Sequence, residues 1–287
     1  MQIRARVLAA VCLWPALVCA QDVAVRGGEK IAFLGDSITA GGMGSPMGYC
    51  RLAISGLEAN GANATAIGAG VSGHKSNQML ERLERDVISK KPDWMTLSCG
   101  VNDVWHGANG VPLDAYKKNI TEIVDKTMAA GIKVMILTST MIGEEQSNPN
   151  NQKLVAYNDF LRELAKEKKC LLADLNADMQ ETLKKMGSNG KTNMLTGDGV
   201  HMNPLGNMMM AKGVLKGFGL SEEQLKKAQD KWLDMPDAME AAGKVKVSMR
   251  QYQQLNTFAA QQRRPLSDIL NEAVAKTVES ILKQAQP

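Results

Sequence analysis

Five short apolar runs, separated by longer stretches of helical periodicity, most constrain how this 287-residue chain can fold. Strands of a parallel sheet that is covered on both faces read as continuous apolar runs, and helices connect them. The pattern therefore predicts an α/β fold built on a five-stranded parallel sheet. The expected strands are 30–35, 64–70, 94–99, 132–138 and 170–174.

The stretches between these runs carry apolar residues at helical spacing. The sequence predicts helices at 46–60, 76–90, 113–130 and 149–168, and a last helix of the core at 204–218. Three glycines at 41, 42 and 44, followed by Pro46, instead predict a flexible turn after the first strand.

Residues 1–20 resemble a secretory signal peptide. Arg4 and Arg6 give a basic start, an apolar run too short to span a bilayer follows, and small residues precede Gln21. We expect cleavage near Ala20 and a secreted or periplasmic mature protein. A lipoprotein anchor at Cys19 is the alternative, but Val18 stands where an anchored protein has a smaller residue.

Charge and cysteine content exclude several classes of protein. The 34 basic residues less Arg4 and Arg6, set against 30 acidic residues, leave a mature net charge of +2, so nothing indicates a nucleic-acid partner. No later segment suits a membrane span. Cys50, Cys99 and Cys170 lack the close pairing of a metal or redox site, allow at most one internal disulfide, and predict no metal site. Cys99 reads as a buried small apolar residue.

Ser37 follows the first apolar run, at the edge where an α/β sheet presents its chemistry. A serine hydroxyl is a weak nucleophile, and it needs an imidazole base that a carboxylate orients. The chain has three histidines, His74, His106 and His201. Only His201 has so local an acidic residue, Asp198, three positions earlier. Alone, this pair could equally cap the helix that enters at Pro204.

A tetrahedral intermediate at Ser37 also needs donors for its oxyanion. Gly70 follows the second strand, where the lack of a side chain lets a backbone N–H approach a ligand. Asn102 follows the third strand and offers a side-chain amide. Each loop alone reads as an ordinary turn, but several such loops at one sheet edge indicate a site.

These blocks, in this order, resemble the SGNH hydrolases, the superfamily of GDSL-type esterases and lipases. Gly-Asp-Ser at 35–37, Gly70, Gly-Val-Asn-Asp at 100–103 and Asp-Gly-Val-His at 198–201 match its four blocks, over roughly residues 30–218. The resemblance implies a flavodoxin-like three-layer α/β/α sandwich and a catalytic triad of Ser37, His201 and Asp198. It also implies an oxyanion hole from the Ser37 and Gly70 N–H groups and the Asn102 side chain, with no cofactor.

Two positions depart from the family pattern. Ile38 stands where the family name implies leucine, which is a mild apolar exchange. Gly68 stands where many relatives have asparagine. The motif also lacks the second glycine of the Gly-x-Ser-x-Gly elbow, which disfavours an ordinary α/β-hydrolase.

The residues after Asn102 look like those of secreted carbohydrate acetylesterases. Trp105 can stack on a sugar and His106 can bind a hydroxyl, although a packed tryptophan and a loop-bracing histidine fit the sequence equally well. Asp36 is a further candidate for substrate binding, but bracing the loop suits its place in the motif, and Asp103 is expected to hold the Asn102 loop.

We expect an O-acetylesterase acting on an acylated small molecule or polysaccharide. The alternatives are a lysophospholipase or thioesterase, and a non-catalytic glycan-binding envelope protein.

The sequence changes character after Gly219, and we predict an SGNH domain over 21–219 and a C-terminal helical extension over 220–287. Ser221 and Gln224 form a capping box for a helix to about Trp232. Two further helices carry apolar stripes. The first has Met249, Tyr252, Leu255 and Phe258, and the second has Leu266, Ile269, Leu270, Val274, Val278, Ile281 and Leu282. Packing on the main domain is the preferred interpretation, and a partner-binding or surface-anchoring arm is the alternative.

Overall fold

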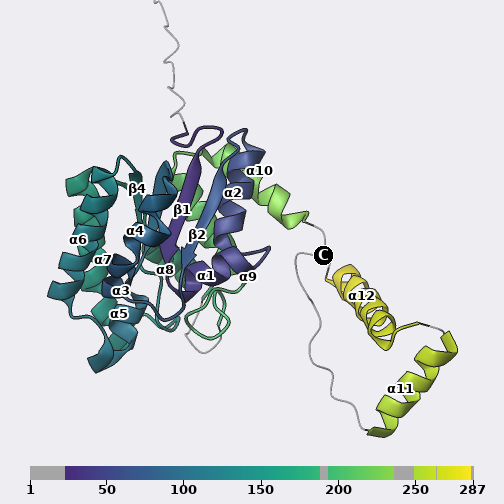
Figure 1. Cartoon of the computed structure of the whole chain (residues 1–287). Helices are drawn as coiled ribbons and strands as arrows, with labels where there is room; N and C mark the ends of the chain where they lie inside the picture. The colour runs from purple at the N-terminus through teal and green to yellow at the C-terminus, as the bar shows by residue number, and fades with distance from the viewer. Residues whose placement is uncertain (1–22, 188–192, 236–248, 263, 286–287) are drawn as a thin grey trace, which may run out of the picture. The chain divides into compact units, whose positions relative to one another are not determined.

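The computed structural model describes residues 23–187, 193–235, 249–262 and 264–285 (Figure 1). These residues divide into two compact units, one ending at Met235 and the other following it. The predicted signal peptide lies outside the described residues. Over the described ranges, no helix is both long and apolar enough to cross a membrane.

Five parallel strands form one sheet in the order β2-β1-β3-β4-β5 (Figure 1). Their bounds confirm the five predicted strands to within one residue at either end. Every residue of β3 is buried, and β1 is buried from Ile31 onward, which explains why both read as apolar runs. The strands are β1 Lys30–Gly35, β2 Thr65–Gly70, β3 Trp94–Ser98, β4 Lys133–Leu137 and β5 Leu171–Ala173.

Helices cover both faces of the sheet and give three layers (Figure 1). On one face α6 and α7 pack on β4, and on the other α2 packs on β2 and α9 on β5. Helix α10 belongs to the same unit and packs on α2 and α9. The strand order is that of flavodoxin-like folds, which confirms the predicted fold class. The helices of these layers are α2 Tyr49–Ala59, α6 Leu113–Ala129, α7 Pro149–Lys168, α9 Pro204–Gly217 and α10 Glu222–Leu233.

The segment after β1 is helical, so the predicted flexible turn is wrong. Helix α1 spans Ser37–Gly44 despite its glycines. Asp36 caps it by accepting a hydrogen bond from the backbone N–H of Ile38 (2.9 Å), and the hydroxyls of Thr39 and Tyr49 are 2.8 Å apart, linking α1 to α2. Tertiary contacts therefore outweigh the low helix propensity of this segment.

Other helices also differ from the sequence prediction. The single helix predicted over 76–90 is broken into α3 (Ser76–Glu81), α4 (Leu83–Asp86) and a 3₁₀ turn at Ile88–Lys90. The first break falls at Arg82, whose side chain turns inward to the strand ends. Helix α5 (Val101–Trp105) follows β3 where a loop was expected, and α8 (Leu175–Lys185) follows β5.

The sheet has its topological switch point between β1 and β3. The chain passes from β1 to β2 on one side, whereas the strand on the other side of β1 is β3. Ligands of open α/β sheets bind in the crevice at the carboxyl ends of such strands. Helix α1, with Ser37, follows β1 there, and α5, with Asn102, follows β3.

The second unit contains α11 (Met249–Gln262) and α12 (Leu266–Gln284), which contact each other. Glu272 pairs with Arg264 and with Lys276, each at 2.8 Å. The two predicted helices are thus confirmed, although the side chains of Met249 and Tyr252 lie outside what the structure describes. The domain limits at 219 and 220, and the surface that the apolar stripes cover, stay predictions.

Candidate active site

Ser37 is the first residue of α1, and only the capping residue Asp36 separates it from Gly35 at the end of β1. Its Oγ lies 2.9 Å from Nε2 of His201. These two residues are far apart in the sequence, so the fold itself brings them into hydrogen-bond contact.

His201 is in turn held by Asp198. Nδ1 of His201 lies 2.7 Å from Oδ2 of Asp198, and the other carboxylate oxygen accepts from the backbone N–H groups of Val200 (3.0 Å) and His201 (2.8 Å). Burial opposes ionisation of this carboxyl, but these hydrogen bonds lower the pKa of Asp198 to about 2. An ionised carboxylate only accepts hydrogen bonds, so its contact with Nδ1 favours the tautomer that is protonated there, in which Nε2 can accept from Ser37.

A buried carboxylate that the sequence analysis did not single out organises the segment leading to Asp198. Glu144 is 5% exposed and accepts from the backbone N–H groups of Met194 (2.7 Å), Leu195 (2.8 Å) and Thr196 (2.8 Å) and from the Thr196 hydroxyl (2.7 Å). The neighbouring N–H of Gly143 donates to the carbonyl of Gly199 (2.7 Å). The loop after β4 is therefore bonded to the loop of Asp198 and His201. Glu144 stands beside Glu145, a pair that reads from sequence as a solvated turn.

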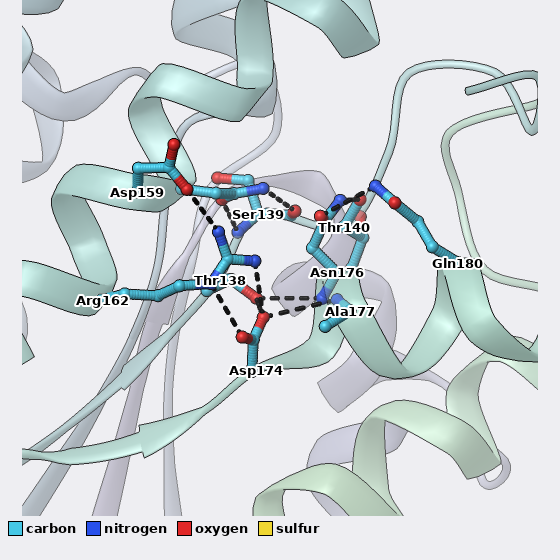
Figure 2. A network of polar contacts seen from close by, with 10 residues as sticks. Thr138, Ser139, Thr140, Asp159, Arg162, Asp174, Asn176, Ala177 and Gln180 are labelled. Carbon is cyan, nitrogen blue, oxygen red and sulfur yellow. Dashed lines mark hydrogen bonds and ion pairs between the residues drawn. The ribbon is translucent and has the colours of Figure 1, made fainter. Parts of the chain in front are cut away.

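The loop after β4 is itself anchored at its base by the polar network of Figure 2. Asp174, after β5, accepts from the Thr138 hydroxyl (3.0 Å) and from the guanidinium of Arg162 (2.7 and 3.0 Å). Asn176 holds the Thr140 carbonyl at 2.6 Å. This network fixes residues 138–140, from which the loop continues to Glu144.

Gly70 ends β2 beside α1. A Cβ atom at this position would lie 2.4 Å from the backbone N of Ala40, so only glycine fits against the helix. The N–H of Val71 donates to the Gly35 carbonyl (3.1 Å). Because alternate N–H groups of a strand point in opposite directions, the N–H of Gly70 points away from β1.

Asn102 is 4% exposed on α5, and its Nδ2 donates to the carbonyl of His74 (3.2 Å). Gly100, two residues before Asn102, has φ +134°, and a Cβ there would lie 2.2 Å from the Ser139 hydroxyl. Only glycine tolerates both this positive φ and this close contact. One amide hydrogen of Asn102 is thus used for positioning, and an amide has a second to offer.

Asp103 braces this loop, as the sequence analysis expected. Its buried carboxylate accepts from the backbone N–H (3.0 Å) and hydroxyl (2.6 Å) of Ser76 and lies 3.5 Å from the Cys99 thiol. Burial raises the pKa of Asp103, and it raises the pKa of Cys99 well above its ordinary value. Cys99 is therefore a buried thiol, and all three cysteines of the described residues are free.

Of the three residues predicted as possible substrate contacts, Asp36 is buried, whereas Trp105 and His106 are exposed. Asp36 is 2% exposed and caps α1, and burial raises its pKa to about 6. Trp105 is 44% exposed at the end of α5, next to the exposed His106. His74 is engaged elsewhere, because its Nδ1 accepts from Arg82 (3.1 Å). Over the described ranges, no cluster of three or more His, Cys, Asp or Glu side chains could hold a metal ion.

Known proteins are similar to the part of the chain that carries these residues. The model of the GDSL-like lipase/acylhydrolase family matches residues 33–209, more than half of the chain. An acetylxylan esterase of Geobacillus stearothermophilus is 28% identical over 68% of this chain and 96% of its own length. The esterase TesA of Pseudomonas aeruginosa is 25% identical over 60% of this chain and 79% of its own.

Solved structures lead to the same family. The crystal structure of the acetyl xylan esterase AlAXEase is 35% identical, covers 65% of this chain and 98% of its own, and superposes with a TM-score of 0.62. The acetylxylan esterase Axe2 of Geobacillus stearothermophilus is 26% identical, with coverages of 69% and 97% and a TM-score of 0.61. The chain belongs to the GDSL-like lipase/acylhydrolase family, within the SGNH hydrolases, and is a carboxylic ester hydrolase.

Proposed function

We propose that this esterase removes short acyl groups, acetyl above all, from carbohydrate through a Ser37-His201-Asp198 triad. The observation that carries the proposal is the continuous pair of contacts from Ser37 Oγ to His201 Nε2 (2.9 Å) and from His201 Nδ1 to Asp198 (2.7 Å). This geometry suits a hydroxyl that loses its proton to a base held in one tautomer.

In the proposed mechanism, Ser37 Oγ attacks the ester carbonyl while His201 Nε2 takes its proton. The oxyanion is stabilised by the N–H groups of Ser37 and Gly70 and by the amide of Asn102. His201 then protonates the departing alcohol, and the acyl group stays on Ser37. Water attacks this acyl-enzyme, passing a proton to His201, and the carboxylic acid leaves as Ser37 is restored.

The substrate class rests on two supports. The relatives described above include two acetylxylan esterases, which match nearly their whole length to this chain. In addition, Trp105 is 44% exposed at the end of the helix that carries Asn102, and an indole face stacks well on a sugar ring. His106 is the adjacent group for a substrate hydroxyl.

We further propose that residues 1–20 direct secretion and are removed near Ala20. One relative is named an uncharacterized lipoprotein, from Bacillus subtilis, at 23% identity over 67% of this chain. The anchored alternative is therefore tested directly: mass spectrometry of the protein from its host should find Gln21 as the first residue. A lipid-modified Cys19 at the N-terminus would contradict plain secretion.

The enzymatic proposal is tested with the purified chain from Gln21 on two substrate sets. Nitrophenyl esters of increasing acyl length measure chain preference, and acetylated xylan measures acetate release from polymer. We expect the acetyl ester to be turned over fastest and acetate to be released from xylan, with both activities lost in Ser37→Ala.

Each outcome separates one alternative. Full activity in Ser37→Ala would exclude the serine mechanism. A preference for long acyl chains or thioesters would favour the lysophospholipase or thioesterase alternative. Absence of turnover on every ester would favour a glycan-binding protein on the same fold.

A further inference from the structure

Arg82 is a charged side chain that is almost fully buried, at 4% exposure, between the ends of β1 and β2. Its guanidinium donates to the carbonyls of Ala69 and Gly35, both at 2.8 Å. Its Nε donates to Nδ1 of His74 (3.1 Å), and its charge pairs with Asp86 (3.0 Å). The contacts with Ala69 and Gly35 lie at the carboxyl ends of β2 and β1, the edge of the sheet that carries Ser37.

Three of the contacts reach the groups proposed to form the oxyanion hole. Gly35 is two residues before Ser37, so its carbonyl fixes the end of the strand that delivers the nucleophile. Ala69 O belongs to the same peptide unit as the N–H of Gly70. His74, through its carbonyl, holds the amide of Asn102 at 3.2 Å.

The contact with Ala69 has a directional consequence. In a trans peptide the C=O and N–H groups point in opposite directions, so a cation that fixes Ala69 O also fixes where Gly70 N–H points. A positive charge on the carbonyl also polarises the peptide and strengthens its N–H as a donor. The planar, multidentate guanidinium suits this task in a way that an ammonium does not.

The local backbone shows what this placement requires. The predicted continuous helix is interrupted at Arg82, which has φ −101° and ψ 2°, and both short helices end at or start from it. Burying a guanidinium costs free energy that its contacts must offset. Asp86 supplies the compensating charge, and hydrogen bonds from Arg85 and Arg82 lower the pKa of Asp86 to about 2, against the effect of its burial.

We propose that Arg82 is a positioning residue for the oxyanion hole, because it joins the peptide of Gly70, the segment holding Asn102 and the strand end before Ser37 into one rigid unit. The inference rests on the proposed serine mechanism. It predicts that loosening Arg82 weakens binding of the transition state more than binding of the substrate.

The principal test compares Arg82→Lys with Arg51→Lys, measuring kcat and KM on an acetyl ester. Arg51 is a matched control, since its guanidinium also donates to a backbone carbonyl, that of Met43 (2.6 Å), but it is exposed and is bonded to none of the groups that Arg82 holds. We expect kcat to fall about 10- to 100-fold in Arg82→Lys with KM nearly unchanged, because the donors it positions act mainly in the transition state. Arg51→Lys should keep its kcat.

A second measurement distinguishes positioning from general support of the fold. A boronic acid forms a tetrahedral adduct with the serine, so its inhibition constant should rise with the loss of kcat in Arg82→Lys and stay unchanged in Arg51→Lys. If Arg82→Lys does not fold, by circular dichroism, His74→Ala provides the test. It removes only the acceptor of Nε, and we expect a several-fold smaller kcat with unchanged KM and weaker boronic acid inhibition.

Three results would overturn the inference. One is an Arg82→Lys enzyme with the kcat of the wild type while Ser37→Ala is inactive, which leaves the proposed function intact. Another is a folded Arg82→Lys, or His74→Ala in its place, that binds the boronic acid as the wild type does. The third is an active Ser37→Ala, which removes the serine mechanism and this inference together.

Discussion

The buried carboxylate of Glu144 accepts hydrogen bonds from both the backbone N–H and the hydroxyl of Thr196, at 2.8 and 2.7 Å. Two residues after Thr196 comes Asp198, the partner of His201. Glu144, on the loop after β4, therefore sets the position of the loop that carries Asp198 and His201.

Glu144→Gln is expected to lower both kcat and stability. The new amide group replaces one acceptor oxygen with donors, which face the N–H groups that Glu144 now binds. A hydrogen bond to a charged group contributes roughly 1.5–3 kcal/mol, so we expect a loss of about that size in the free energy of unfolding, measured in urea. Glu145→Gln, one residue away and exposed, is the control and should change neither quantity. An unchanged kcat in Glu144→Gln would show that this carboxylate does not position His201.

Asp36 predicts a pH dependence of stability. Its pKa rises from 3.8 unfolded to about 6 folded because it is buried, so the folded state binds its proton more tightly than the unfolded state does. The stabilisation that protonated Asp36 gives to the folded state is complete below pH 3.8 and is lost as the pH rises through 6. Since each pKa unit corresponds to about 1.4 kcal/mol, the wild type should lose up to about 3 kcal/mol relative to Asp36→Asn over this range.

The measurement is urea unfolding of both proteins at pH 4, 5, 6 and 7. Asparagine is the suitable replacement because it caps a helix as well as aspartate and carries no charge. The difference in free energy of unfolding between the two proteins should change steadily over this range. A difference that stays constant with pH would contradict the raised pKa of Asp36.

Gly70→Ala tests the close approach of β2 to α1. The new Cβ would lie 2.4 Å from the N of Ala40 and 2.8 Å from the C of Thr39, and both are backbone atoms that cannot turn aside. Overpacking of this kind costs roughly 1–3 kcal/mol, and displacing an oxyanion donor lowers kcat by about 100-fold. Gly68→Ala is the matched control on the same strand, where the Cβ would meet only the flexible Met43 at 3.3 Å. Equal kcat in the two variants would remove Gly70 from the site.

The strands could be predicted from sequence because their apolar runs carry the signal locally, whereas the Asp198–His201 block follows no strand and depended on the resemblance to the family. Ser37 at the end of β1 and Gly70 at the end of β2 followed from that pattern. The helix at Ser37–Gly44 did not, since its glycines disfavour a helix and its stability comes from the Asp36 cap and from contacts with α2.

Arg82 and Glu144 show why the supporting residues escaped prediction. Each is bonded to segments that lie elsewhere in the sequence, Arg82 to the strand ends at Gly35 and Ala69 and Glu144 to Met194–Thr196. Charged residues in helical or turn segments usually face solvent, so sequence alone predicts exposure for both. Their burial is a property of the assembled sheet edge, and only the structure reveals it.

Trp105→Ala distinguishes a sugar platform from a packing residue. Trp105 is 44% exposed, so its removal should cost little stability, whereas loss of the exposed indole face should weaken binding of a carbohydrate that stacks on it. We expect KM for acetylated xylo-oligosaccharides to rise several-fold while kcat and KM for nitrophenyl acetate stay unchanged, since this ester has no sugar ring to stack on the indole. Leu205→Ala is the control, because Leu205 is also an exposed apolar side chain, on a different helix. If Trp105→Ala lowers turnover of both substrates equally, the indole supports the Asn102 helix and does not bind sugar.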